Sequence, residues 1–98
     1  MAQPDITLTL VTRRDCHLCE AMEAAVADVR RQIPCDLELR DVDADAALLA
    51  SYSDQVPVLL VNGRKAFKYR VTPAALASRL RAERRRARLR GWFGPRPP

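Results

Sequence analysis

The spacing of apolar residues changes between residues 6 and 33, and this change constrains the fold more than any other feature of the sequence. Residues 6–12, ITLTLVT, are β-branched and almost continuously apolar, as is typical of a strand covered on both faces. From Leu18 onward apolar residues recur at gaps of three and four, which predicts an amphipathic helix that Pro34 ends. The residues of this apolar stripe are Leu18, Met22, Ala25, Val26, Val29 and Ile33. A strand leading directly into a helix favours a βαβ unit with a right-handed crossover.

The middle of the chain carries weaker signals for one more strand and one more helix. Residues 36–43, DLELRDVD, alternate well enough to predict a second strand. Residues 43–53, DADAALLASYS, predict a short second helix, and Asp43 or Asp45 can cap its first turn.

A hairpin and a third helix follow. Asn62 and Gly63 stand between two β-type runs, and both tolerate the positive φ of a type I′ turn. After the turn, residues 64–71 alternate as a strand with one exposed face. Thr72 and Pro73 then predict the start of a helix, with the threonine as its cap and the proline as its first residue.

These elements together predict an α/β fold in the order β-α-β-α-β-β-α. The expected structure is a mixed four-stranded sheet with helices on both faces. Ninety-eight residues are enough for one domain with a modest core. No apolar run reaches the roughly 18 residues that a membrane span needs, and the N-terminus lacks the pattern of a secretory signal, so we expect a cytoplasmic protein.

Charge is distributed unevenly along the chain. From Arg79 onward there are eight arginines and a single acid, Glu83, whereas the residues before Arg79 carry nine basic and eleven acidic side chains. We therefore divide the chain into a domain of residues 1–82 and a basic helix extension with a flexible Pro/Arg tail, residues 83–98. The arginines from Arg79 to Arg90 are either a solvated helix surface or a contact for an acidic protein, a nucleic acid or an anionic surface.

The stretch CHLC, residues 16–19, lies where the first strand gives way to the first helix. Cys16 is expected at the N-terminus of that helix, where unpaired backbone N–H groups and the helix dipole favour a thiolate over a thiol. Cys19 follows one turn later on the same face, within disulfide reach and deeper. This placement predicts Cys16 as the nucleophile and Cys19 as the resolving thiol of a redox pair.

Other roles for the cysteines compete with this one. If both cysteines were simply small core residues, the buried position expected for Cys19 would be explained. The partly exposed position expected for Cys16 at the start of the helix would not. A zinc site is disfavoured because the only further ligands, His17 and Cys35, are poorly placed, so no metal is expected. An iron–sulfur cluster shared between two chains stays open. His17 either tunes the pair or is a solvated helix residue, and Cys35 is either a small buried side chain or a regulatory thiol.

With these motifs in place, residues 6–82 resemble the small glutaredoxin-like proteins of the thioredoxin superfamily. The resemblance rests on the strand–CHLC–helix order, on Gln55 to Val58 (QVPV) before the hairpin, and on the hairpin-to-helix ending. It implies a thiol–disulfide oxidoreductase that works without a bound cofactor, as a monomer, on a disulfide-containing protein or on glutathione.

The resemblance also implies roles for particular residues. It implies that Pro57 is cis and that the backbone of Val56 faces Cys16 and binds an extended peptide or glutathione. Arg13 matches a basic residue that could pair with a glutathione carboxylate, and Thr72 could offer its hydroxyl. The stretch KYRVTPAA, residues 68–75, lacks the glycine pair and acid that hold glutathione in the family. The alternative function is an iron–sulfur carrier or a non-catalytic binding module docked through the arginine-rich C-terminus.

Overall fold

The elements follow one another in the predicted order in a computed structural model, which describes the backbone of residues 5–92 and the side chains of residues 5–89. The predicted flexible tail, apart from its first residues, lies outside this range. The elements are β1 (Thr7–Thr12), α1 (His17–Arg30), β2 (Asp36–Asp41), the 3-10 turn η1 (Val42–Ala44), α2 (Ala46–Tyr52), β3 (Val58–Val61), β4 (Arg64–Lys68) and α3 (Pro73–Trp92).

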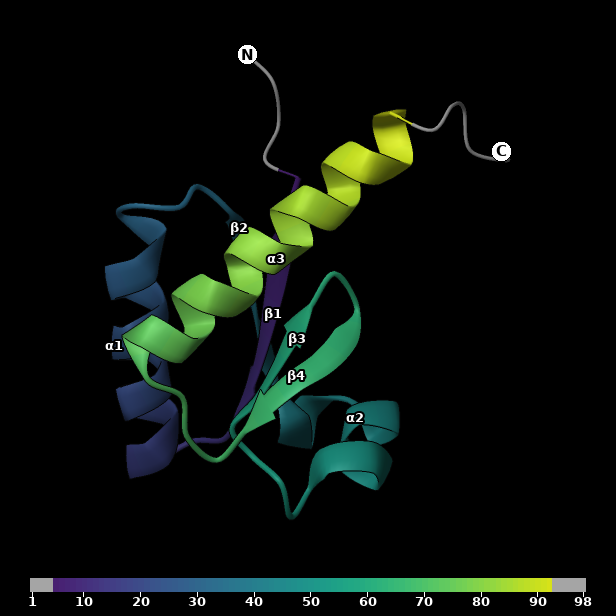
Figure 1. Cartoon of the computed structure of the whole chain (residues 1–98). Helices are drawn as coiled ribbons and strands as arrows, with labels where there is room; N and C mark the ends of the chain where they lie inside the picture. Colours follow the sequence, from purple (N-terminus) through teal and green to yellow (C-terminus); the bar gives the residue numbers. More distant parts are fainter. Residues whose placement is uncertain (1–4, 93–98) are drawn as a thin grey trace.

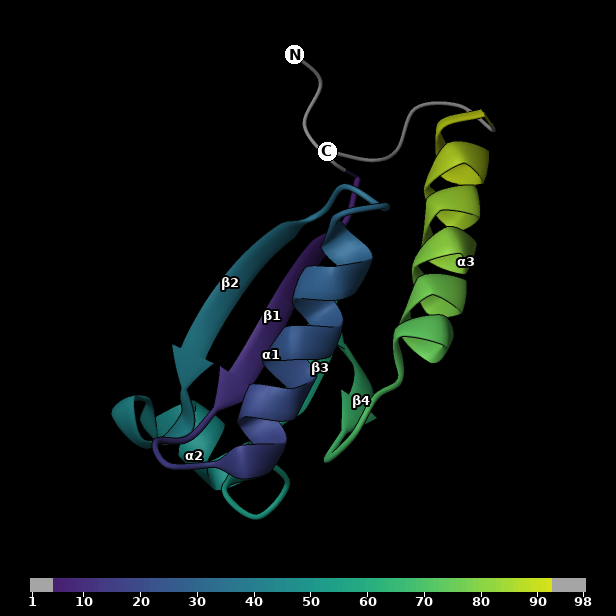
Figure 2. The ribbon, with the colours of Figure 1, turned by 90° about the vertical axis from the view of Figure 1, so that its left-hand side faces the viewer.

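The four strands form one mixed sheet in the order β2-β1-β3-β4. Strand β1 pairs in parallel with β2 and antiparallel with β3, and β3 and β4 form the antiparallel hairpin. Helices α1 and α3 contact each other over one face of the sheet, and α2 lies on the other side (Figures 1 and 2). The predicted α/β fold, a mixed four-stranded sheet with helices on both faces, is confirmed.

The core has two parts because alternate residues of the β1 strand point to opposite faces. Leu8 and Leu10 join the larger cluster, between the sheet and helices α1 and α3, whereas Val11 joins the smaller one, under α2. The larger cluster also holds Ile6, Met22, Val26, Val29, Ile33, Cys35, Leu59, Val61, Leu76 and Leu80. Each large apolar side chain buried in this way contributes about 1.5–3 kcal/mol to the free energy of unfolding.

Helix α1 ends earlier than the sequence predicts. Its last residue is Arg30. In the turn that follows, the backbone N–H of Arg31 donates to the Asp28 carbonyl and that of Ile33 donates to the Val29 carbonyl. Ile33 is still buried, so the apolar stripe continues through a turn after the helix itself has ended. The stop predicted at Pro34 was therefore too late by one turn.

The last strand is also shorter than its alternation predicts. The β3–β4 pairing is irregular between Leu59 and Leu60, so that Leu59 pairs with Phe67 and Leu60 with Lys65. This bulge brings Ala66 and Phe67 into partial burial together, which breaks the expected alternation of residues 64–71. Strand β4 ends at Lys68, because Tyr69 turns into the left-handed region with φ 68°.

The hairpin turn itself forms as predicted and ties α3 to the sheet. Asn62 and Gly63 have φ values of 50° and 83°. The Asn62 side chain accepts a hydrogen bond from the backbone N–H of Thr7 at 2.8 Å and donates one to Glu83 at 3.1 Å. Glu83 is buried and forms an ion pair with Arg79. The predicted division after residue 82 therefore falls inside a continuous helix, beside a side chain that packs into the domain.

Candidate functional site

Cys16 is the N-cap of α1, with an extended backbone at φ −118° and ψ 107°. Its sulfur accepts the backbone N–H of Cys19 at 3.1 Å, one of the donors that a helix start leaves unpaired. The two cysteines are joined in a disulfide, with their Cα atoms 5.2 Å apart. Cys19 is only 2% exposed, whereas Cys16 is partly exposed. The predicted placement of the two sulfurs is thus what the structure shows, and their division of labour is taken up below.

Arg13 fixes the loop that leads into this helix. Its guanidinium donates two hydrogen bonds to the Asp43 carboxylate, at 3.0 and 3.2 Å, and one to the Ser53 carbonyl at 2.8 Å. The hydrogen bond to Asp43 raises the pKa of Arg13, so the group stays charged. These contacts tie the β1–α1 loop to the η1 turn and the end of α2. In the structure the Arg13 guanidinium is hydrogen-bonded to the Asp43 carboxylate. The contact with a glutathione carboxylate that the resemblance implies stays a prediction.

The Arg13–Asp43 pair was missed by the sequence reasoning, which treated Asp43 as one of two candidate caps for α2. Asp45 is the actual cap, accepting the backbone N–H groups of Ala47 and Leu48. No local pattern could have found the pair, because its partners are 30 residues apart and meet only through the crossover.

His17 is the first residue of α1 and its side chain is fully exposed. Its Nδ1 lies 3.3 Å from a carboxylate oxygen of Glu20, one turn along the helix. This contact becomes an ion pair when the imidazole is protonated. The side chain stands in solvent beside the disulfide, so its influence on the pair stays a prediction.

The Val56–Pro57 peptide bond is cis, as the family resemblance implies. Pro57 is buried, and its carbonyl accepts the backbone N–H of Tyr69 at 2.8 Å. Val11 near the end of β1 pairs with Val58 at the start of β3. Pro57, just before β3, therefore lies at the same end of the sheet as the loop that leads from β1 to Cys16. The Val56 side chain packs against the smaller core cluster. The binding of a peptide backbone at Val56 stays a prediction.

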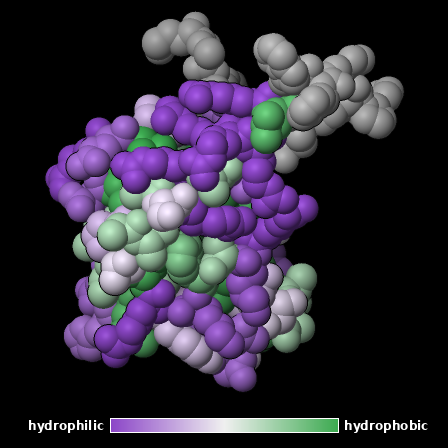
Figure 3. All heavy atoms as spheres, in the orientation of Figure 1, coloured by the Kyte–Doolittle hydropathy of each residue, from purple (hydrophilic) through white to green (hydrophobic). Residues whose placement is uncertain are grey.

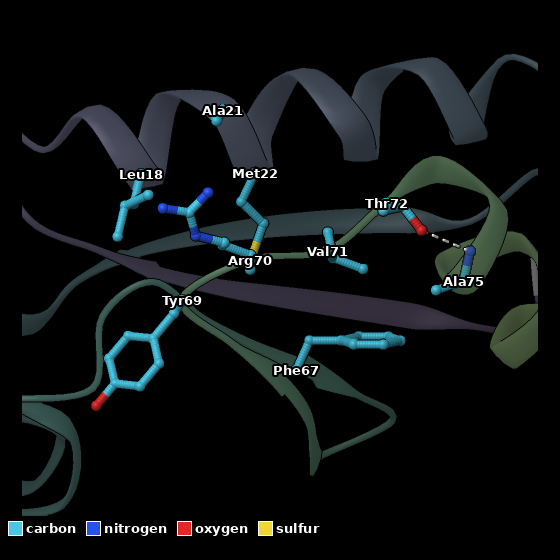
Figure 4. Close-up of a pocket in the computed structure, with 9 residues that line it drawn as sticks. All are labelled: Leu18, Ala21, Met22, Phe67, Tyr69, Arg70, Val71, Thr72 and Ala75. Atoms are coloured by element: carbon cyan, nitrogen blue, oxygen red, sulfur yellow. Dashed lines mark hydrogen bonds between the residues drawn. The ribbon is translucent and has the colours of Figure 1, made fainter.

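A pocket of about 400 Å³ opens between the first turns of α1 and the loop joining β4 to α3 (Figure 4). Leu18, which stands between the two cysteines in the sequence, lines one side of it, and Tyr69 and Arg70 line the other. The remaining lining residues are Ala21, Met22, Phe67, Val71, Thr72 and Ala75. The lining is mostly apolar, with Arg70 as its only charged side chain.

Thr72 is part of this pocket, and its hydroxyl oxygen already accepts one hydrogen bond within the chain. It accepts the backbone N–H of Ala75 at 3.1 Å, as the predicted cap of α3. The Tyr69 hydroxyl donates to the Asp54 carbonyl at 3.0 Å, which holds the ring across the loop. The sequence reasoning named Thr72 and missed the pocket, because Leu18 and Met22 had been counted as one apolar stripe facing the core. The half-exposure of Leu18 is a tertiary effect that periodicity does not report.

Cys35 lies far from this site. It is 5% exposed, just before β2, and its carbonyl accepts a hydrogen bond from Arg30, the last residue of α1. Burial is the largest influence on its thiol and raises its pKa. The prediction of a small buried side chain is confirmed.

Within residues 5–89, no three histidine, cysteine, aspartate or glutamate side chains come together as a candidate metal site. The iron–sulfur alternative is a hypothesis that no observation in this part of the chain favours. No helix in the described range is both long and apolar enough to cross a bilayer.

Comparison with known protein families identifies the family to which this chain belongs. A model of the family described as Glutaredoxin-like domain (DUF836) matches residues 7–81. The chain belongs to this family. The match runs from the start of β1 into α3 and so contains both cysteines, the cis proline and the pocket.

Relatives of this glutaredoxin-like chain occur in bacteria of different genera. A protein of Mycobacterium tuberculosis strain H37Rv, named as uncharacterized, is 30% identical over 70 residues, which cover 66% of this chain and 70% of that protein. A structural genomics target from X. campestris is 36% identical, with a TM-score of 0.66 over 76% of this chain and 96% of its own.

Two further solved structures extend the fold comparison. Protein Ne2328 from Nitrosomonas europaea is 26% identical, with a TM-score of 0.68 over 80% of this chain and 93% of its own. A thioredoxin variant from Halobacterium salinarum, at 23% identity, has a TM-score of 0.62 over 82% of this chain and 75% of its own. At that identity the thioredoxin comparison bears on the fold alone.

Proposed function

We propose that this chain is a thiol–disulfide oxidoreductase in which Cys16 is the nucleophile and Cys19 the resolving thiol. The carrying observation is the position of Cys16. Its sulfur is the partly exposed member of the pair, sits at the start of α1 and accepts a helix N–H. That N–H and the helix dipole stabilise negative charge on the same sulfur when the disulfide is open.

The reaction conserves atoms and electrons in two exchange steps. The Cys16 thiolate attacks one sulfur of the substrate disulfide, forms a mixed disulfide, and releases the other substrate sulfur as a thiolate, which takes up a proton. The Cys19 thiol then loses its proton and attacks the Cys16 sulfur, which releases the second substrate thiol and leaves the Cys16–Cys19 disulfide. Two electrons pass from the cysteine pair to the substrate, and the reverse sequence oxidises a dithiol partner.

The surroundings favour a protein substrate over glutathione. The two side chains that the resemblance offers to glutathione are engaged within the chain, Arg13 with Asp43 and Thr72 with the backbone of Ala75. The apolar pocket beside Leu18 suits a large apolar side chain next to the substrate cysteine. An extended substrate segment would lie along the backbone of Val56 while that side chain enters the pocket.

A trapping experiment tests the proposal. The reduced Cys19→Ser variant is mixed with a peptide disulfide that carries a leucine or phenylalanine beside its cysteine, and the products are mapped by mass spectrometry. We expect a stable mixed disulfide at Cys16, because the serine cannot resolve it. The matched Cys16→Ser variant should form little adduct, since Cys19 is buried. Equal adduct formation by both variants would contradict the assigned roles.

A further inference from the structure

The second half of α3 carries a concentration of positive charge that the proposed redox chemistry does not use. Among the described side chains, none of the arginines after Arg79 forms an ion pair. They are Arg81, Arg84, Arg85, Arg86 and Arg88, and all are at least partly exposed. The single acid of this segment, Glu83, is buried and paired with Arg79. Among the described side chains, these five arginines therefore have no ion-pair partner.

Four of these arginines share one side of the helix. Arg81, Arg84, Arg85 and Arg88 follow the i, i+3, i+4, i+7 spacing that puts residues on a common face. At about 1.5 Å per residue, the stripe is about 10 Å long. We call these four residues the arginine stripe.

The stripe is held in place and accessible. The hydrogen bond from Asn62 to Glu83 and the burial of Leu80 fix the middle of α3 against the domain. Beyond that point the helix projects past the β3–β4 hairpin (Figures 1 and 2). The surface over this half of the helix is largely hydrophilic (Figure 3). The start of α1 lies toward the opposite end of the molecule (Figure 1). Cys16 is the N-cap of this helix, so occupation of the stripe leaves Cys16 open.

We propose that the arginine stripe binds the phosphate backbone of a nucleic acid without regard to sequence. The guanidinium fork matches phosphate oxygens in pairs, and every basic residue from residue 79 onward is an arginine rather than a lysine. Arg81 and Arg85 are about 6 Å apart along the axis, so neighbouring stripe residues can reach successive phosphates.

Other polyanionic partners fit this surface less well. Insertion into an anionic membrane needs a continuous apolar helix face. Among the described residues beyond Leu80, α3 offers only Ala82, Ala87 and the exposed Leu89 as apolar side chains. An acidic protein would need apolar anchor positions beside the charges, because the core of a protein interface is apolar and poor in charge. Among the described side chains, Leu89 is the single large apolar one beside the stripe, and one such position does not make an apolar interface core.

Fluorescence anisotropy with the full chain tests the proposal, using a labelled single-stranded DNA and the duplex of the same sequence. We expect binding that weakens steeply between about 50 and 200 mM salt, with a slope of log K against log salt concentration of about −3 to −4 for four phosphate contacts. The Arg81→Gln/Arg85→Gln/Arg88→Gln variant should bind at least about tenfold more weakly at low salt, with a slope shallower by about 2 to 3. Glutamine keeps nearly the same helix propensity, so the fold should persist.

The matched control removes three exposed positive charges elsewhere, as Arg14→Gln/Arg31→Gln/Arg64→Gln. It should keep most of the affinity and slope, and Cys16→Ser should bind like the unaltered chain, which separates this proposal from the redox one. Equal losses in the stripe variant and the control would overturn the proposal in favour of a net-charge effect. Tighter binding to anionic lipid vesicles or to polyglutamate than to DNA, or no binding at low salt, would overturn it as well.

Discussion

The two ends of helix α1 hold cysteines in opposite environments. At its start, the Cys16 sulfur is partly exposed and accepts a helix N–H. Beyond its end, Cys35 is buried and its thiol pKa is raised by that burial. Fourteen helical residues, about 21 Å, lie between the two sites. On the proposed function, the same side chain is reactive at one end and inert at the other because of where the helix and the core place it. The tests below remove one cysteine or alter its surroundings.

The largest expected effect comes from removing the sulfur at the helix start. Cys16→Ser should reduce the rate of disulfide exchange with a peptide disulfide by about 10³-fold or more, because the attacking nucleophile is lost. Cys35→Ser should leave the rate within about twofold, since Cys35 takes no part in the exchange steps. The measurement is the rate of thiol release, and a comparable loss in both variants would remove the contrast between the two ends.

A smaller effect should follow from narrowing the pocket beside the reactive end. Ala75→Leu places a larger side chain among the lining residues. We expect a roughly fivefold slower reaction with a peptide disulfide that carries a bulky apolar neighbour, and little change with a small disulfide, because only the former fills the pocket. Ala74→Leu, at an exposed position that lies outside this lining, is the matched control. If both disulfides slow equally, the pocket does not select the substrate.

The buried Cys35 should make the stability of the folded chain depend on pH in the alkaline range. Because the pKa of Cys35 is raised in the folded chain, the folded state holds its proton more tightly than the unfolded state. Its contribution to stability is complete below the unfolded pKa and is lost as pH rises from there toward the folded pKa. In reducing buffer, the free energy of unfolding should fall more between about pH 8 and pH 10.5 for the unaltered chain than for Cys35→Ala. Parallel pH curves would contradict this prediction.

The smallest effect concerns the anchor of the loop before Cys16. Asp43→Asn leaves Arg13 without its ion-pair partner, and the free energy of unfolding should fall slightly but measurably, because water and salt screen an exposed pair. Asp36→Asn, at an exposed carboxylate with no ion pair among the described residues, is the control. Chemical denaturation measures both. Identical stability of the two variants would show that the pair does not hold the loop.

Local patterns in the sequence were sufficient to predict the parts of the site that depend on local structure. The change in the spacing of apolar residues between residues 12 and 18 predicts a helix start at Cys16, and Asn62–Gly63 predicts the hairpin turn. Both features depend on neighbouring residues only. The cis state of Pro57 came from the family resemblance and not from composition. These elements account for the order of the fold and for the position of the disulfide.

Apart from the early end of α1 at Arg30, which is set by local hydrogen bonds, the features that sequence reasoning missed depend on contacts between distant segments. The Arg13–Asp43 pair joins residues 30 apart, and the hydrogen bond between Asn62 and Glu83 joins residues 21 apart. The bulge at Leu59 and Leu60 changes which residues of β4 are buried, and the pocket exists only once α1 and the β4–α3 loop meet. Periodicity reports which face of an element is apolar, and it does not report what that face will touch.

The most direct test of the central claim is a pulse of alkylation on the fully reduced chain near neutral pH. A substoichiometric amount of iodoacetamide is added, the reaction is quenched, and the labelled cysteine is identified by peptide mapping. We predict that the label lies almost entirely on Cys16, and that Cys19 and Cys35 take it up only after unfolding. Label distributed evenly over the three cysteines, or concentrated on Cys35, would contradict the claim that the start of α1 makes its cysteine the reactive one.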